Sequence, residues 1–146
     1  MTQRTVCRKD GARVESSDRE RLADACMKVK SPKILITHGI QGAIETVCSI
    51  FTLHYHENIT LILLQALSLR RVESLGSKTI VVTGSIVPDC MKQSDATFNI
   101  GVALGALNVL RRGVFICMNG RIFESSRCTY DNSTKTFVSS SSSSKK

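Results

Sequence analysis

Aromatic side chains are scarce in this sequence. Tryptophan is absent and the aromatic fraction is 5%. Proteins that bind single-stranded nucleic acid stack bases on aromatic rings set among basic residues, and the chain has no such platform. The net charge is +8, but beyond residue 33 its basic residues are scattered, with Arg70-Arg71, Arg111-Arg112 and Lys145-Lys146 as the pairs. We interpret them as a solvated surface, and a nucleic-acid partner is not expected.

The hydrophobic pattern of the sequence also predicts no targeting segment and no membrane-spanning segment. No basic-then-apolar signal opens the chain, and the apolar run at 59–69 is too short and too interrupted to span a bilayer. We therefore expect a cytoplasmic protein without a membrane partner. The six cysteines include no CxxC pair, and in that compartment we expect free thiols.

Motifs for metal or serine chemistry are incomplete. His54 and His56 could form a metal pair, but a metal site needs three or four ligands and we find no third. No metal and no cofactor are therefore expected. Ser85 has no histidine and aspartate partners that the sequence would place near it, which argues against a serine hydrolase.

The chain has the length of one ordinary domain, with 146 residues of which 42% are hydrophobic. Short apolar runs that predict strands alternate with segments of helical periodicity. This alternation predicts an α/β fold with a doubly wound, mostly parallel sheet. The expected strands lie at 34–36, 78–83 and 114–118, and the expected helices lie near 17–29, 44–51 and 94–110.

Several local signals refine this prediction. Ser17 and Glu20 have the spacing of a capping box, and Asn119-Gly120 is typical of a hairpin turn. The helix at 94–110 is apolar nearly all round, which predicts that it is buried. We expect one domain over 1–137, with an insertion of uncertain structure at 54–76 and a disordered Ser/Lys tail at 138–146.

Ligands of doubly wound sheets bind outside the carboxyl ends of the strands. The loops that follow the predicted strands should therefore meet at one crevice. These loops lie at 10–11, 37–41, 84–88 and 119–120.

Four blocks of the sequence, in order, resemble the N-terminal domain of bacterial-type L-asparaginases, closest to the short single-domain members of that family. Lys9-Asp10 matches a further block, whereas 54–76 matches nothing in the family. The resemblance implies the fold of that domain and hydrolysis of the side-chain amide of asparagine through a threonine nucleophile and an acyl-enzyme. The four blocks cover 34–46, 77–84, 94–101 and 113–123.

The chemically essential positions of the family are changed here. In the family loop T-H-G-T-D-T, Thr37, His38 and Gly39 match, but the reactive Thr-Asp pair is replaced by Ile40 and Gln41. The family lysine falls at or near Tyr130, and the serine that holds the substrate carboxylate falls on Gly11. The T-G-G-T-I segment is absent, so the resemblance predicts a sheet that is incomplete at its N-terminus.

We therefore interpret the chain as a degenerate asparaginase-type domain, truncated relative to the family and inactive as a hydrolase. The alternative is a pseudoenzyme that binds an amino acid or a partner chain through the same crevice. The candidate substrate-binding residues are Thr37, His38, Gly39, Gly84 and Ser85, with asparagine or aspartate as the ligand. Family members usually form homo-oligomers, which extends to this chain as an expectation. The sequence leaves open whether the chain is a fragment of a longer product or a divergent protein.

Overall fold

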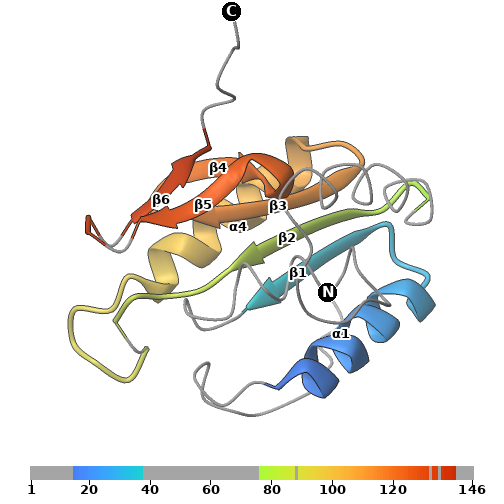
Figure 1. Ribbon diagram of the computed structural model, residues 1–146, viewed down its shortest axis with the longest axis horizontal. Coiled ribbons are helices and arrows are strands. Elements are labelled where there is room, and N and C mark those ends of the chain that lie inside the picture. Colours follow the sequence, from blue (N-terminus) through green and yellow to red (C-terminus); the bar gives the residue numbers. More distant parts are fainter. Residues whose placement is uncertain (1–14, 38–75, 88, 132, 135, 141–146) are drawn as a thin grey trace, which may run out of the picture.

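The computed structural model describes residues 15–37, 76–87, 89–131, 133–134 and 136–140. A four-stranded sheet in the order β1-β2-β3-β4 forms its centre (Figure 1). The first three strands are parallel, and β4 is antiparallel to β3. The elements in chain order are α1 (Ser16–Lys28), β1 (Lys33–Thr37), β2 (Thr79–Thr83), α4 (Ala96–Val109), β3 (Gly113–Met118), β4 (Arg121–Glu124), a 3-10 turn at Ser125–Arg127, β5 (Cys128–Asp131) and β6 (Thr136–Ser139).

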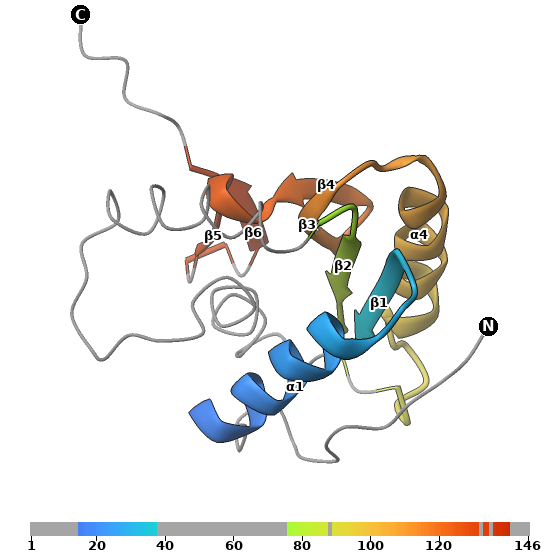
Figure 2. The same cartoon turned by 90° about the vertical axis from the view of Figure 1, so that its right-hand side faces the viewer.

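The two helices cover opposite faces of the sheet. Figure 2 shows α1 on one side of β1 and β2 and α4 on the other. Successive side chains of a strand point to opposite faces, so Ile80 and Val82 of β2 lie in the core under α1, whereas Val81 lies in the core under α4. All five residues of β2 are buried in consequence. The prediction of a doubly wound, mostly parallel α/β sheet is confirmed.

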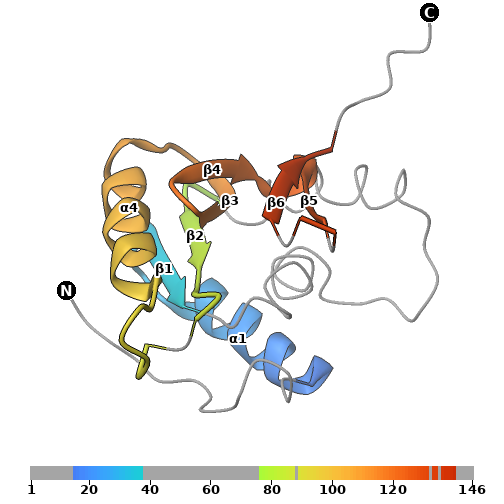
Figure 3. The same ribbon diagram turned by 90° about the vertical axis from the view of Figure 1, so that its left-hand side faces the viewer.

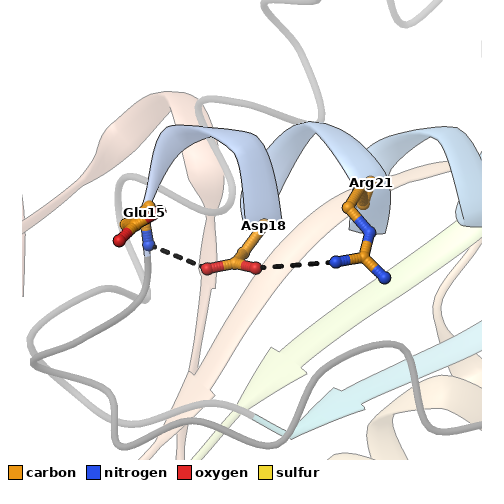
Figure 4. Close-up of polar contacts among 3 residues, drawn as sticks. All are labelled: Glu15, Asp18 and Arg21. Carbon is orange, nitrogen blue, oxygen red and sulfur yellow. Dashed lines mark hydrogen bonds and ion pairs between the residues drawn. The ribbon is translucent and has the colours of Figure 1, made fainter.

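The start of α1 differs from the predicted capping box. The helix begins at Ser16 with Glu15 as its N-cap, and the carboxylate of Asp18 accepts the backbone N–H of Glu15 at 3.1 Å (Figure 4). Asp18 is buried, and Arg21 lies 3.9 Å from its other oxygen. The cap therefore lies two residues before the predicted pair Ser17 and Glu20, because an Asp at the third helical position can satisfy the first N–H as well as a Glu.

Helix α4 is buried on one side, so the prediction of burial all round is wrong. Its inner side contributes Ala103 and Leu107 to the core, whereas Phe98 is 59% exposed and Val109 is 77% exposed. The composition concealed this division because apolar residues occupy both sides of the helix. Among the described residues, no helix is long and apolar enough to cross a bilayer.

The hairpin between β3 and β4 is confirmed. Asn119 and Gly120 both have positive φ values, 53° and 74°, which is the pattern of a type I′ turn. This turn reverses the chain at the carboxyl end of β3 and pairs Met118 with Arg121. The sequence thus predicted both the element and the residues that form it.

A second hairpin follows Arg127, where the sequence analysis predicts no helix or strand. Figure 3 shows β5 and β6 beside β4, on the side away from α4. Phe137 of β6 is buried in the core under α1, which anchors the hairpin. Strand β6 also includes Val138 and Ser139, the first two residues of the predicted tail. Of the predicted insertion at 54–76, Gly76 is described, in a turn before β2.

Candidate functional site

The carboxyl ends of the parallel strands form one edge of the sheet, which we call the carboxyl edge. In register, Thr37 at the end of β1 lies opposite Thr83 at the end of β2. The arrowheads of these strands point to the left in Figure 1. Gly84 and Ser85 follow β2, and the turn at 119–120 follows β3. Three of the loops predicted to converge thus begin at the same edge.

A buried amide ties two of these loops together. Asn99 lies on the inner side of α4, and its side chain is 0% exposed. Its Nδ2 donates to the carbonyl oxygen of Gly84 at 2.9 Å, and its Oδ1 accepts the backbone N–H of Asn119 at 3.1 Å. The spacing between the loop after β2 and the turn after β3 is therefore fixed by one side chain with both polar ends satisfied.

Asp95 extends this network along the loop after β2. Its carboxylate accepts the N–H groups of Ile86 at 2.9 Å and Val87 at 3.0 Å, and it accepts Nδ2 of Asn99 at 2.7 Å. Partial burial would raise the pKa of the Asp95 carboxyl, but these donors outweigh it and hold the pKa below its usual value. A carboxylate that binds its proton weakly and is saturated with donors is a poor general base.

Ser94 and Asp95, at the start of α4, divide two roles between them: one side chain caps the helix and the other binds the loop after β2. Asp95 is the N-cap, but its side chain serves the loop instead of the first helical N–H groups. Ser94 accepts the N–H of Ala96 at 3.1 Å and donates to the carbonyl of Val87 at 2.8 Å. The serine thus supplies the side-chain contact that a cap normally makes, and the aspartate binds the backbone of the loop after β2.

The hydroxyl groups at this edge differ in their surroundings. Thr83 is buried, and its hydroxyl donates to the carbonyl of Cys117 on β3 at 2.8 Å, so it holds two strands together. Thr37 is exposed and Ser85 is partly buried. The three histidines of the chain all lie outside the described residues, so none is placed beside these hydroxyls. The described part of the chain also contains no group of His, Cys, Asp and Glu side chains suited to a metal ion.

The two buried cysteines, Cys26 and Cys117, and the half-buried Cys128 are not candidate nucleophiles. Desolvation raises the pKa of Cys26 to about 11, against a smaller opposing effect from Lys78, and desolvation alone raises the pKa of Cys128 to about 11. Burial also raises the pKa of Cys117. A thiol attacks as the thiolate, which these shifts suppress. The four described cysteines are free, as predicted.

The structure describes part of the predicted site. Thr37, Gly84 and Ser85 lie at the carboxyl edge as the sequence indicated. His38, Gly39, Ile40 and Gln41 lie outside the described residues, as does Gly11. The backbone of Tyr130 lies in β5, paired with Phe137 of β6.

Asn99 and Asp95 are the functional candidates that the sequence interpretation missed. A signal was present: an amide in an otherwise apolar helix, four residues after the acidic residue at the N-cap, places both on one helix face.

Comparison with known proteins identifies the family. A family model described as "Asparaginase, N-terminal" matches residues 64–144, more than half of the chain. The chain belongs to the asparaginase N-terminal domain family. The matched range includes Gly84, Ser85, Asp95, Asn99 and Tyr130, and it begins after the loop at 37–41. No curated protein matches the chain in sequence.

Solved asparaginases share the fold. The thermostable L-asparaginase from Thermococcus kodakarensis superimposes with a TM-score of 0.69 at 20% identity, covering 93% of this chain and 37% of its own. L-asparaginase I from Vibrio cholerae O1 biovar eltor gives a TM-score of 0.60 at 22% identity, covering 90% and 35%. The chain thus spans little more than a third of the length of these proteins.

Proposed function

We propose that this asparaginase-type domain binds a small amino acid, asparagine or aspartate, at the carboxyl edge of its sheet and does not hydrolyse it. The observation that carries the proposal is the Asn99 bridge between the loop after β2 and the turn after β3. The Asn99 side chain is fully buried with both of its polar ends paired, and it keeps the loop after β2 and the turn after β3 at a fixed spacing. Family membership supplies the ligand class, because the solved neighbours are named as L-asparaginases.

The absence of turnover is proposed from the residues at the reactive positions. Ile40 has no hydroxyl and Gln41 has no charge, so neither can replace the Thr-Asp pair of the family loop. Among the described residues at the edge, the hydroxyl of Thr83 is committed to a carbonyl and the carboxylate of Asp95 to backbone N–H groups. Removing a set of catalytic groups that act as a unit typically costs several orders of magnitude in rate.

Calorimetric titration with asparagine and with aspartate tests the proposal. We expect saturable heat with a Kd of about 1 mM or tighter, which corresponds to roughly −4 kcal/mol. Thr37→Ala and Ser85→Ala should weaken binding, because both side chains lie at the edge where the ligand would bind. The matched controls Thr129→Ala and Ser126→Ala remove exposed hydroxyls far from that edge and should leave binding unchanged.

Two results would count against the proposal. No heat with either amino acid would remove the small-molecule ligand and favour the alternative, a partner chain bound at the same edge. Release of ammonia from asparagine would show that the domain retains hydrolytic activity. We also propose that the chain self-associates, as the family resemblance suggests, and sedimentation equilibrium would measure this. A cytoplasmic location, which the sequence suggests, is part of the same proposal.

A further inference from the structure

Strand β1 is the outermost strand at the parallel side of the sheet (Figure 1). One side of β1 pairs with β2, and within the described residues no strand pairs with its other side. A strand at the margin of a sheet presents a row of backbone N–H and C=O groups to which another chain can bind. The outer side of β1 is therefore a candidate interaction surface, which we call the β1 edge.

The hydrogen bonds around β1 show which of its backbone groups point outward. The carbonyl of Pro32 accepts the N–H of Thr79 at 2.7 Å, so Pro32 faces β2. Backbone groups of successive residues point to alternate sides of a strand, so Ile34 and Ile36 also face β2. Three residues then present their N–H and C=O groups at the β1 edge: Lys33, Leu35 and Thr37.

The hydroxyl of Ser31 already binds one of these three residues. It donates to the carbonyl of Lys33 at 2.9 Å and accepts the N–H of Lys33 at 3.4 Å. No described residue makes a comparable contact with the outward N–H and C=O groups of Leu35 and Thr37. These four groups are therefore available to a further strand.

The two margins of the sheet differ in how they are protected against such pairing. At the far margin, the short strand β4 begins and ends with the exposed charges of Arg121 and Glu124, and the β5–β6 hairpin lies beside it (Figure 3). Charged side chains and a covering segment both discourage pairing with another chain. At the β1 edge the charged side chain is Lys33, and its Nζ is bound to the carbonyl of Asn108 on α4 at 3.1 Å. In the part of the chain that the structure describes, the β1 edge thus lacks the protection that β4 has.

An apolar flank of α4 borders the β1 edge. The opposite flank carries Phe98, because a Cβ built on Gly120 in the turn after β3 would lie 3.5 Å from the Phe98 ring. Successive residues of a helix are about 100° apart, so Ile100 lies about half a turn round from Phe98, on the flank toward β1, and Leu104 follows one turn later. Ile100 is 36% exposed, Leu104 is half-buried, and no residue of α4 is charged.

We propose that two copies of the chain pair their β1 strands antiparallel, so that one continuous sheet runs through both copies. A two-fold axis through Ile36 would place Leu35 opposite Thr37 of the second copy, and each such pair would exchange its N–H and C=O groups. About four backbone hydrogen bonds would form, and the contact between Ser31 and Lys33 would stay intact. The inference rests on the self-association proposed above and assigns it to one surface.

The symmetry of this pairing favours a second copy over an unrelated strand. Helix α4 packs over β2, where Val81 lies in one core with Ala103 and Leu107. Three strand spacings of about 4.8 Å would therefore separate the two α4 helices by about 14 Å. Helices with their side chains are about 10–12 Å wide, so Ile100 and Leu104 of both copies would approach one another across the axis. Because α4 is uncharged, no like charges would meet there.

Sedimentation velocity and hydrogen exchange on the full chain test the proposal together. We expect a monomer–dimer equilibrium with a Kd of about 10–100 µM, because the interface is small. Exchange is then measured by residue-resolved mass spectrometry well below and well above that Kd. The amides of Leu35 and Thr37 should exchange slowly only in the dimer, whereas those of Ile34 and Ile36, bonded to β2, should exchange slowly in both states.

A matched pair of lysine substitutions on α4 tests the position of the interface. Ile100→Lys would bring two like charges together beside the axis and should raise the Kd of the dimer at least tenfold. Val109 lies nine residues after Ile100, on the opposite flank, and is 77% exposed. Val109→Lys makes the same change of charge and should alter the Kd less than threefold. Circular dichroism verifies the fold of both variants.

Four results would overturn the proposal. The chain could stay monomeric at millimolar concentration. A dimer in which Leu35 exchanges as fast as in the monomer would leave self-association standing and assign it to another surface. Slow exchange of Leu35 in the monomer would show that a segment of the same chain covers the β1 edge. Equal effects of Ile100→Lys and Val109→Lys would show that position on α4 does not matter.

Amino-acid binding is tested independently of this pairing. Calorimetry without heat on titration with asparagine would leave the β1 dimer intact, because the dimer uses backbone groups of β1 and not the side chains of Thr37 and Ser85.

Discussion

An uncharged polar side chain inside an apolar helix costs stability unless every donor and acceptor is paired. Asn99 meets this requirement through Gly84, Asp95 and Asn119. Substitution by leucine would leave the carbonyl of Gly84 and the N–H of Asn119 without this partner. We expect Asn99→Leu to lower the free energy of unfolding by about 2–4 kcal/mol.

Chemical denaturation measures this effect against a control in the same helix. Asn108 is exposed, so Asn108→Leu makes the same change without breaking a buried network and should shift stability by less than about 0.5 kcal/mol. If the two substitutions cost the same, the Asn99 bridge does not hold the carboxyl edge together.

The described thiols should divide sharply in reactivity. Cys90 is exposed, whereas Cys26 and Cys117 are buried and burial raises the pKa of both. Alkylation with iodoacetamide near pH 8, followed by peptide mass mapping, should label Cys90 in the native protein and the buried pair only after unfolding. Rapid native labelling of Cys26 or Cys117 would contradict the packing of the two cores.

Asp131, the last residue of β5, provides a titration test. Hydrogen bonds from the side chains of Ser133 and Thr134 lower its pKa from 3.8 to about 2. Because the folded-state pKa is depressed, the stabilising effect is present above about pH 4 and is lost as the pH falls through about 2. A carboxyl NMR titration should give a midpoint near 2, and Ser133→Ala/Thr134→Ala should return it toward 3.8. An unchanged midpoint in that variant would show that the turn does not form these bonds.

At the scale of elements, two glycines should respond to alanine in opposite directions. Gly120 has a positive φ of 74°, which is strained for a residue with a Cβ, so Gly120→Ala should destabilise the hairpin by about 1–2 kcal/mol, although the added Cβ would make only ordinary contact with the ring of Phe98 at 3.5 Å. Gly101 lies in α4 with open space around its Cβ position, and Gly101→Ala should stabilise the protein by about 0.5–1 kcal/mol. Thermal unfolding would measure the two opposite changes in stability. Destabilisation by Gly101→Ala would mean that this side of α4 is covered.

Strong local signals explain which elements could be predicted from the sequence. The conformations of β2, with its β-branched run, and of the Asn119-Gly120 turn are determined by residues that are adjacent in the sequence. Burial of α4 depends on what packs against it, so a helix that is apolar on both sides did not reveal that Phe98 faces solvent. The β5–β6 hairpin was missed because its polar strands are held by one buried residue, Phe137. The position of Thr37 and Ser85 at the carboxyl edge followed from topology. The Asn99 bridge could not be predicted in this way, because its partners Gly84 and Asn119 lie 15 and 20 residues away in the sequence.

At the scale of the whole molecule, the two ends of the parallel strands differ in chemistry. The carboxyl edge is organised by hydrogen bonds to backbone groups and carries little net charge among the described residues. At the opposite edge, where the parallel strands begin, Lys33 and Lys78 donate to carbonyl groups at the ends of α4 and α1. The chain has the fold of the L-asparaginase structures that it resembles, and the proposal that it lacks turnover depends on Ile40 and Gln41 standing at the positions that the family resemblance implies are reactive.

Asparagine labelled with ¹⁵N in its side-chain amide tests the central claim, binding without hydrolysis, in one NMR sample. We expect the protein to transfer saturation to the amino acid, and we expect no ¹⁵N-ammonium signal above the protein-free control over a day. Growth of the ammonium signal in proportion to protein concentration would contradict the claim of an inactive site. Absence of saturation transfer at millimolar asparagine would contradict the claim of a ligand at the carboxyl edge.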